Sequence, residues 1–109
     1  MRPSNEPLVW AIFSAGGVVL ALVAPALIVL TGFVVPAEEV SFERLFDIFG
    51  SPFVRLILFG MALLTFFHAA HRLRHTVMDL GLRSAAVSVA VISYGIAIAG
   101  VIWAATIVL

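Results

Sequence analysis

The sequence predicts an all-α integral membrane protein with three transmembrane helices. Hydrophobic residues make up 63% of its 109 residues and charged residues only 11%, whereas about a quarter of the residues in a typical soluble domain are charged. A helix needs about 20 consecutive apolar residues to cross the hydrocarbon core of a bilayer. Three segments meet this requirement, so we expect helices at about residues 8–35, 52–75 and 82–108 within a single membrane domain spanning residues 1–109.

Composition and motifs exclude several classes of function. The net charge is zero, which gives no electrostatic footprint for nucleic acid. The chain has no cysteine, so it cannot supply disulfides or ligate an iron–sulfur cluster through thiolates. It contains no phosphate-binding loop, metalloprotease motif or nucleophile elbow, and little sequence lies outside the apolar segments. If the chain belongs to an enzyme, we expect it to be a non-catalytic subunit.

The first predicted helix, residues 8–35, combines a tryptophan near its start with small residues further along. Trp10 lies where indole rings commonly sit at a membrane interface, although its N–H could instead be donated to a ligand. Gly17 and Ala21 have the spacing that lets two helices approach closely. Pro25 predicts a kink, because proline lacks an N–H and its ring clashes with a preceding carbonyl.

An acidic connection, residues 36–51, separates the first two predicted helices. It contains four acidic residues and one arginine, with leucine, isoleucine and phenylalanine between them. This pattern predicts a short amphipathic helix at the membrane interface, and a solvated loop with one apolar side fits equally well. Arg55, in the first turn of the next predicted helix, can extend its guanidinium to the head groups and act as an anchor for that helix end.

All three histidines lie near the end of the second predicted helix, within the sequence FHAAHRLRHTVMD. At helical spacing, one face carries these histidines and one arginine: His68, His71, Arg72 and His75. Arg74 is expected to point elsewhere. Such a row of polar groups could serve a polar ligand, bind a metal, or simply orient the chain at the membrane surface.

The metal-binding alternatives are the weaker ones. A haem held by two histidines needs one imidazole on each face, and these histidines share one helix face. The chain therefore cannot hold haem alone. Zinc would find suitable histidine spacing, but no carboxylate on the same face. We expect neither a metal nor a haem in this chain.

The third predicted helix, residues 82–108, contains small residues at packing distance and a tryptophan at its far end. We interpret these residues as helix-packing and belt features: Ser88, Ser93, Tyr94, Gly95, Ala99, Gly100, Ala104 and Trp103. A transporter is a poor match, because no polar groups lie at mid-membrane to form a pathway.

Arginine placement predicts the orientation. Three arginines lie at the end of the second predicted helix or just after it, at residues 72, 74 and 83, and Arg2 precedes the first predicted helix, whereas the acidic connection has one arginine. Since cytoplasmic loops are enriched in arginine and lysine, we expect a cytoplasmic N-terminus. Trp10, His71 and Arg72 would then lie at similar depth, where they could line a pocket for an amphipathic ligand with a polar head, such as a quinone.

Three stretches carry a resemblance to a known family: EPLVWAIFSAGG, SFERL and HRLRHTVMDL. Together they closely resemble the D-subunit of fumarate reductase. The resemblance implies a hydrophobic anchor subunit in the bacterial inner membrane, assembled with a flavoprotein subunit, an iron–sulfur subunit and the hydrophobic C-subunit. It also implies the haem-free class of this enzyme, in which menaquinol supplies electrons to fumarate in anaerobic respiration.

The resemblance also implies a menaquinone site shared with the partner subunits. Carried onto this sequence, its residues are the tryptophan of the EPxxW motif, the HR pair, and a phenylalanine one turn from the tryptophan: Trp10, Phe13, His71 and Arg72. The chain departs from the family pattern at Arg74 and Met78, where the pattern often has histidine. The alternatives are a purely structural anchor without quinone contact and a haem-binding anchor of the cytochrome b type.

Overall fold

The computed structural model describes residues 4–109, which form helices and contain no strand. The long helices are α1 (Glu6–Val29), α3 (Pro52–Asp79) and α4 (Ala86–Val108). Together with the short helical turns that adjoin α1 and α4, they give three segments long and apolar enough to cross a membrane. The predicted all-α fold with three transmembrane helices is confirmed, and the chain is a multi-pass membrane protein.

The first membrane-spanning segment is longer than a straight crossing requires. A π-helical turn, η1 (Leu30–Val34), continues α1 directly, and the Val35 N–H donates to the carbonyl of Leu30 at 2.9 Å. α1 runs through Pro25 without ending there. The combined segment has 29 residues; at 1.5 Å per residue it is about 43 Å long, against a hydrocarbon core of about 30 Å.

A glycine turn joins α3 to α4. α3 extends to Asp79, beyond the expected end at residue 75. Gly81 follows with a φ of 106°, a backbone conformation that glycine adopts without steric cost, and its N–H donates to the Met78 carbonyl at 3.1 Å. A 3₁₀ turn, η2 (Arg83–Ala85), then leads into α4. The chain therefore reverses direction within a few residues.

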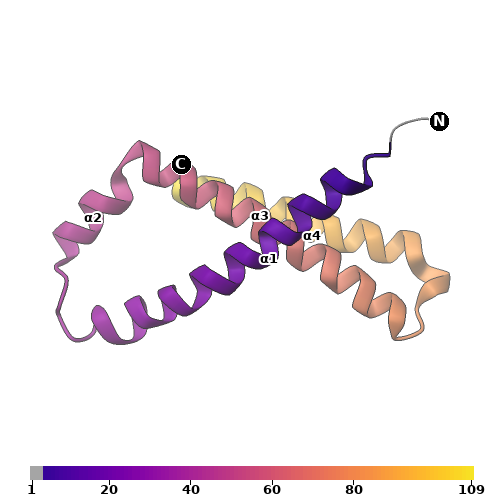
Figure 1. Ribbon diagram of the computed structural model, residues 1–109, viewed down its shortest axis with the longest axis horizontal. Coiled ribbons are helices and arrows are strands. Elements are labelled where there is room, and N and C mark those ends of the chain that lie inside the picture. Colours follow the sequence, from indigo (N-terminus) through magenta and orange to yellow (C-terminus); the bar gives the residue numbers. More distant parts are fainter. Residues whose placement is uncertain (1–3) are drawn as a thin grey trace.

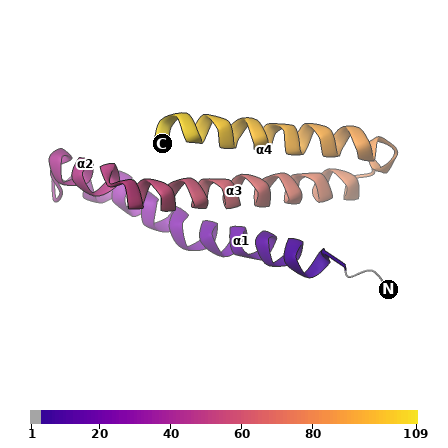
Figure 2. The same cartoon turned by 90° about the horizontal axis from the view of Figure 1, so that it is seen from above.

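The three long helices are arranged with α3 between the other two (Figure 2). α4 runs back alongside α3, whereas α1 crosses α3 at an angle (Figure 1). The start of α1 and the turn between α3 and α4 lie at the same end of the molecule, and α2 lies at the other end (Figure 2). This arrangement brings residues from the start of α1 close to the second half of α3.

Small residues set the contacts between the helices. Gly16 is the only buried residue of α1, and a Cβ there would lie 2.5 Å from the carbonyl oxygen of Leu64 in α3. On the other side of α3, the ring of Phe66 lies against Gly100, where a Cβ would be 2.5 Å from the ring. Of the expected packing glycines in α4, Gly95 instead has open space beside it.

The acidic connection contains a helix, α2 (Phe42–Gly50). The Ser41 side chain caps it by accepting a hydrogen bond from the Arg44 backbone N–H at 3.2 Å. Its apolar side carries exposed aromatic rings, among them Phe42 and Phe46. Of the two interpretations that the sequence left open, the amphipathic helix is confirmed.

The described chain buries few residues within itself. Its buried apolar side chains are all alanines, at Ala70, Ala97 and Ala104. Large apolar side chains on every long helix are exposed, including Leu22 at 71% and Val87 at 78%. Because an exposed apolar surface of this extent is unsuited to water, it is the surface that faces lipid or partner subunits.

Candidate functional site

Histidines of α3 lie beside aromatic residues from the start of α1. The Phe13 ring centroid is 4.5 Å from that of His68 and 4.7 Å from that of His71. The Trp10 ring lies edge-on to Phe13 at 5.5 Å and to His71 at 6.1 Å. His75 meets His71 at a centroid distance of 4.5 Å. We call these five side chains the aromatic–histidine cluster.

His68 is held against α1 by Phe13. The two rings are stacked with an interplanar angle of 17°, and the His68 Nδ1 donates to the main-chain carbonyl of Phe13 at 2.9 Å. A carbonyl oxygen has no proton to donate, so Nδ1 must carry the hydrogen. Gly17 leaves room for this imidazole, because a Cβ at that position would lie 2.8 Å from the His68 Cε1.

His71 is tied to the third membrane helix. Its Nδ1 lies 3.0 Å from the hydroxyl of Tyr94 in α4, and both side chains are partly buried. Within residues 4–109, this is the only hydrogen bond that joins two side chains. The guanidinium carbon of Arg74 lies 5.9 Å from the centroid of the Tyr94 ring, within reach of a cation–π interaction.

A groove runs along this cluster and draws its walls from all three long helices. Its volume is 140 Å³ and its lining is mainly apolar, with two imidazoles and one phenol as the polar side chains. The lining residues are Val9, Ile12, Phe13, Phe67, His68, His71 and Tyr94. Sites that enclose a drug-sized ligand usually measure about 300–1,000 Å³. This groove can therefore form one wall of such a site, but not the whole of it.

The four residues expected from sequence occupy different places relative to the groove. Phe13 and His71 line it. Trp10 touches both of them from the rim and is 57% exposed. Arg72 is exposed and does not line the groove. Arg74, which we expected to point away from the histidine face, lies on the side toward α4 and approaches Tyr94.

Sequence reasoning missed the part that Tyr94 plays in this groove, because it interpreted that residue as a packing feature. The bounds predicted from the sequence, residue 75 for the end of one helix and residue 82 for the start of the next, do not pair Tyr94 with His71, and only the observed ends of α3 and α4 do so. His71 lies as many residues before the end of α3 as Tyr94 lies after the start of α4. Residues at equal distances from a tight helical turn face one another across an antiparallel pair. The same reasoning gives no contact for His68, whose partner lies on α1.

The histidines do not form a metal site in the described part of the chain. Between residues 4 and 109, no group of three or more histidine, aspartate, glutamate or cysteine side chains is arranged to hold a metal ion. The Nδ1 of His68 and the Nδ1 of His71 each have a hydrogen-bonding partner within the protein. The arrangement instead offers flat aromatic surfaces together with groups that can donate or accept protons.

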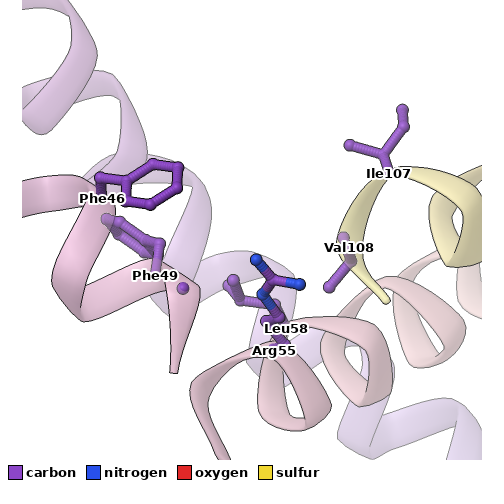
Figure 3. A pocket seen from close by; sticks show the side chains of 7 residues that line it. Phe46, Phe49, Arg55, Leu58, Ile107 and Val108 are labelled. Carbon is purple, nitrogen blue, oxygen red and sulfur yellow. The ribbon is translucent and has the colours of Figure 1, made fainter. Parts of the chain in front are cut away.

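A second groove lies at the other end of the molecule, between α2, the start of α3 and the end of α4. Its lining includes Arg55 together with Phe46, Phe49 and Val108, and its volume is 320 Å³. Figure 3 shows the Arg55 guanidinium in the space between these apolar side chains. It contains a cation but no histidine or other group that exchanges protons near neutral pH. The aromatic–histidine cluster is therefore the better candidate for chemistry.

The matching family model and the two relatives named here share one description. Residues 1–109 match the family model for the fumarate reductase D-subunit. The chain is 38% identical over 104 residues to the fumarate reductase D-subunit of Mycobacterium tuberculosis, an alignment that covers 91% of this chain and 82% of the relative. The protein of the same description from Vibrio campbellii is 34% identical over 84 residues, covering 72% of this chain and 67% of the relative.

Proposed function

This chain belongs to the fumarate reductase D-subunit family, and we propose that its aromatic–histidine cluster forms part of the menaquinol-binding site of the complex. As a member of that family, the chain is a membrane-anchor subunit of fumarate reductase, in complex with other subunits of the enzyme. The proposal adds a role in the electron-donating reaction to this anchoring role. We place the complex in the bacterial inner membrane, where menaquinol is dissolved.

The observation that carries the proposal is the meeting of Trp10, Phe13 and His71 at one groove. Phe13 and His71 are 4.7 Å apart between ring centroids, and Trp10 contacts both rings. An apolar groove with a few well-placed polar groups is typical of small-molecule sites. A naphthoquinone head group is flat and apolar with an oxygen at each end, and so matches a wall of aromatic rings next to hydrogen-bonding groups.

The side chains of the groove supply proton transfer and orientation. Oxidation of menaquinol releases two electrons and two protons, and the electrons pass singly to the iron–sulfur subunit. In our proposal His71 takes one proton, since an imidazole can accept a proton near neutral pH. The Trp10 N–H donates to an oxygen of the head group from the rim. Phe13, with Val9 and Ile12, forms an apolar wall that excludes water from the reacting oxygen.

Partner subunits complete the site in this proposal. The groove has a volume of 140 Å³, which is too small to surround a head group, and its open side requires a second wall. We assign that wall, and the release of the second proton, to the iron–sulfur subunit and the hydrophobic C-subunit. Arg72, which is exposed and outside the groove, would reach the ligand only at that boundary between subunits, where its charge stabilises a developing quinone anion.

The test compares two activities of the membrane-bound complex carrying His71→Ala. We expect menaquinol-linked fumarate reduction to fall by about 100-fold, the scale of a lost general base, while fumarate reduction with a soluble artificial donor is retained. Thr76→Ala is the matched control, because Thr76 lies on the same helix but is exposed and does not line the groove. Trp10→Phe removes the indole N–H and should weaken the quinol reaction to a smaller extent.

The other outcomes separate the alternatives. If His71→Ala and Trp10→Phe both retain the quinol reaction, this subunit is an anchor without a part in the menaquinol site. Loss of both activities indicates that the complex has not assembled, which the content of flavoprotein in the washed membranes measures directly. In that case His71→Gln, which keeps a hydrogen-bonding side chain of similar length, takes the place of the alanine variant.

A further inference from the structure

We infer that Tyr94 is a positioning residue for His71 in the quinol reaction; this rests on the proposed function of the groove. The two side chains come from different helices, and the distance between the Tyr94 hydroxyl and the His71 Nδ1 is 3.0 Å. Both residues also line the groove. Tyr94 therefore contacts the proposed acid–base group and the space for the ligand at the same time.

The hydrogen bond decides which nitrogen of His71 is available to a ligand. With Nδ1 engaged by Tyr94, Nε2 is the nitrogen left for the head group. An imidazole without such a partner can rotate, so Nε2 would not be held toward the groove. The hydrogen bond to Tyr94 thus fixes the orientation of the His71 ring and leaves Nε2 as the nitrogen that faces a ligand.

A phenol suits this role because it can both donate and accept a hydrogen bond. When Tyr94 accepts from Nδ1–H, the neutral Nε2 has a free lone pair and can accept a proton from a quinol hydroxyl. When Tyr94 donates to Nδ1, Nε2 carries a hydrogen and can donate to a quinone carbonyl. After Nε2 has taken a proton from the quinol, both ring nitrogens carry a hydrogen, so Nδ1–H still donates to Tyr94 and Nε2–H can donate to the quinone carbonyl. The same pair therefore fits the head group before and after oxidation.

Arg74 holds the other side of the phenol. Its guanidinium carbon lies 5.9 Å from the centroid of the Tyr94 ring, and an arginine at this distance is attracted to the ring face. The ring is therefore restrained by Arg74 at its face and by His71 at its hydroxyl. These two contacts restrain Tyr94 in addition to its place in the groove wall, which distinguishes it from a residue that only lines the groove.

The test is Tyr94→Phe in the assembled, membrane-bound complex. This change removes the hydroxyl and keeps the ring that faces Arg74. We expect the kcat of menaquinol oxidation to fall about tenfold, the effect of losing roughly one good hydrogen bond, with soluble-donor activity unchanged. The matched control is Ser93→Ala, which removes a hydroxyl from the neighbouring buried position that does not line the groove. It should leave both activities unchanged.

A second measurement does not depend on turnover. Equilibrium dialysis gives the Kd of the complex for menadione, a naphthoquinone without the isoprenoid tail. We expect Tyr94→Phe to raise this Kd several-fold and Ser93→Ala to leave it unaltered. The variants Tyr94→Phe and His71→Gln are then combined. If Tyr94 acts through His71, the double variant should bind and turn over no worse than His71→Gln alone.

The outcomes keep this inference apart from the proposed function. If His71→Gln slows the quinol reaction but Tyr94→Phe changes neither kcat nor Kd, Tyr94 has no positioning role and the proposed function stands. If the effects of the two variants multiply in full, Tyr94 acts independently of His71 and the inference fails. If His71→Gln itself has no effect, the proposed function fails, and the inference fails with it.

Discussion

The imidazole of His68 lies flat on the ring of Phe13, and its Nδ1 donates to the main-chain carbonyl of the same residue at 2.9 Å. One side chain of α3 thus contacts both the side chain and the backbone of a single residue in α1. The contact is possible because Gly17 has no Cβ in the place that the imidazole occupies. Together with Gly16, these three residues form the contact where α1 crosses α3, and they give the first two predictions.

Gly17→Ala should push the imidazole away from α1. The new Cβ would lie 2.8 Å from the His68 Cε1, and overpacking of this kind typically costs about 1–3 kcal/mol. We expect a lower midpoint of thermal inactivation for the complex and a weaker quinol reaction. Gly60→Ala is the control, because Gly60 also lies inside a long helix but has nothing within 4 Å of its Cβ position. An unchanged midpoint for Gly17→Ala would contradict the close approach.

His68→Phe should be tolerated better than His68→Ala. Phenylalanine retains the stacked ring and loses one hydrogen bond, worth about 1 kcal/mol. Alanine loses the stacked contact as well and leaves a gap beside Phe13, so we expect a further loss of about 1–2 kcal/mol. Thermal inactivation of the membrane-bound complex ranks the two variants. The reverse order would mean that the hydrogen bond to the carbonyl matters more than the ring.

A complementary pair of substitutions tests the contact between α3 and α4. Gly100→Ala places a Cβ 2.5 Å from the Phe66 ring, so we expect fewer assembled complexes in the membrane. Phe66→Leu, which replaces the ring with a smaller side chain, should restore assembly in the Gly100→Ala background. If Phe66→Leu lowers the amount of assembled complex equally in the Gly100→Ala variant and in the unaltered chain, the two residues are not in contact and the assignment is wrong. The amount of complex is measured by detergent extraction and gel filtration.

Ser41→Ala should loosen α2 without affecting the long helices. The Ser41 hydroxyl accepts from the Arg44 N–H at 3.2 Å, and removing such a cap typically costs about 1 kcal/mol. Amide hydrogen exchange in α2 should therefore accelerate about fivefold, whereas exchange in α3 stays the same. Ser41→Asp preserves the cap and serves as the control. Equal protection of α2 in both variants would show that membrane contact rather than capping holds this helix.

Hydropathy was sufficient to predict the three membrane helices, because the bilayer sets their length and composition. The topology predicted from arginine placement put Trp10 and His71 at the same end of the molecule, and the structure brings them into contact. The end of α3 was less predictable, since the mixed polar and apolar residues that follow His75 are compatible with either helix or loop. Gly81, with its positive φ, marks the actual turn.

The rotation of each helix about its own axis could not be predicted from the sequence. Helical spacing places His71 and Arg72 in one broad face, but packing decides which of them turns toward the groove. In the structure His71 points between α1 and α4, and Arg72 is left exposed. The contact between Tyr94 and His71 could not be predicted either, because it also depends on the position of α4 along α3 after the turn.

The groove takes its walls from α1, α3 and α4, although α3 keeps the other two helices apart along most of their length (Figure 2). A molecule bound there would touch two helices that have little direct contact with each other. By mass action, a ligand present at about 100 times its Kd adds about 2.7 kcal/mol to the state that binds it. Occupancy and helix association are therefore linked, so an anchor depleted of its ligand should come apart at a lower temperature than one that is saturated.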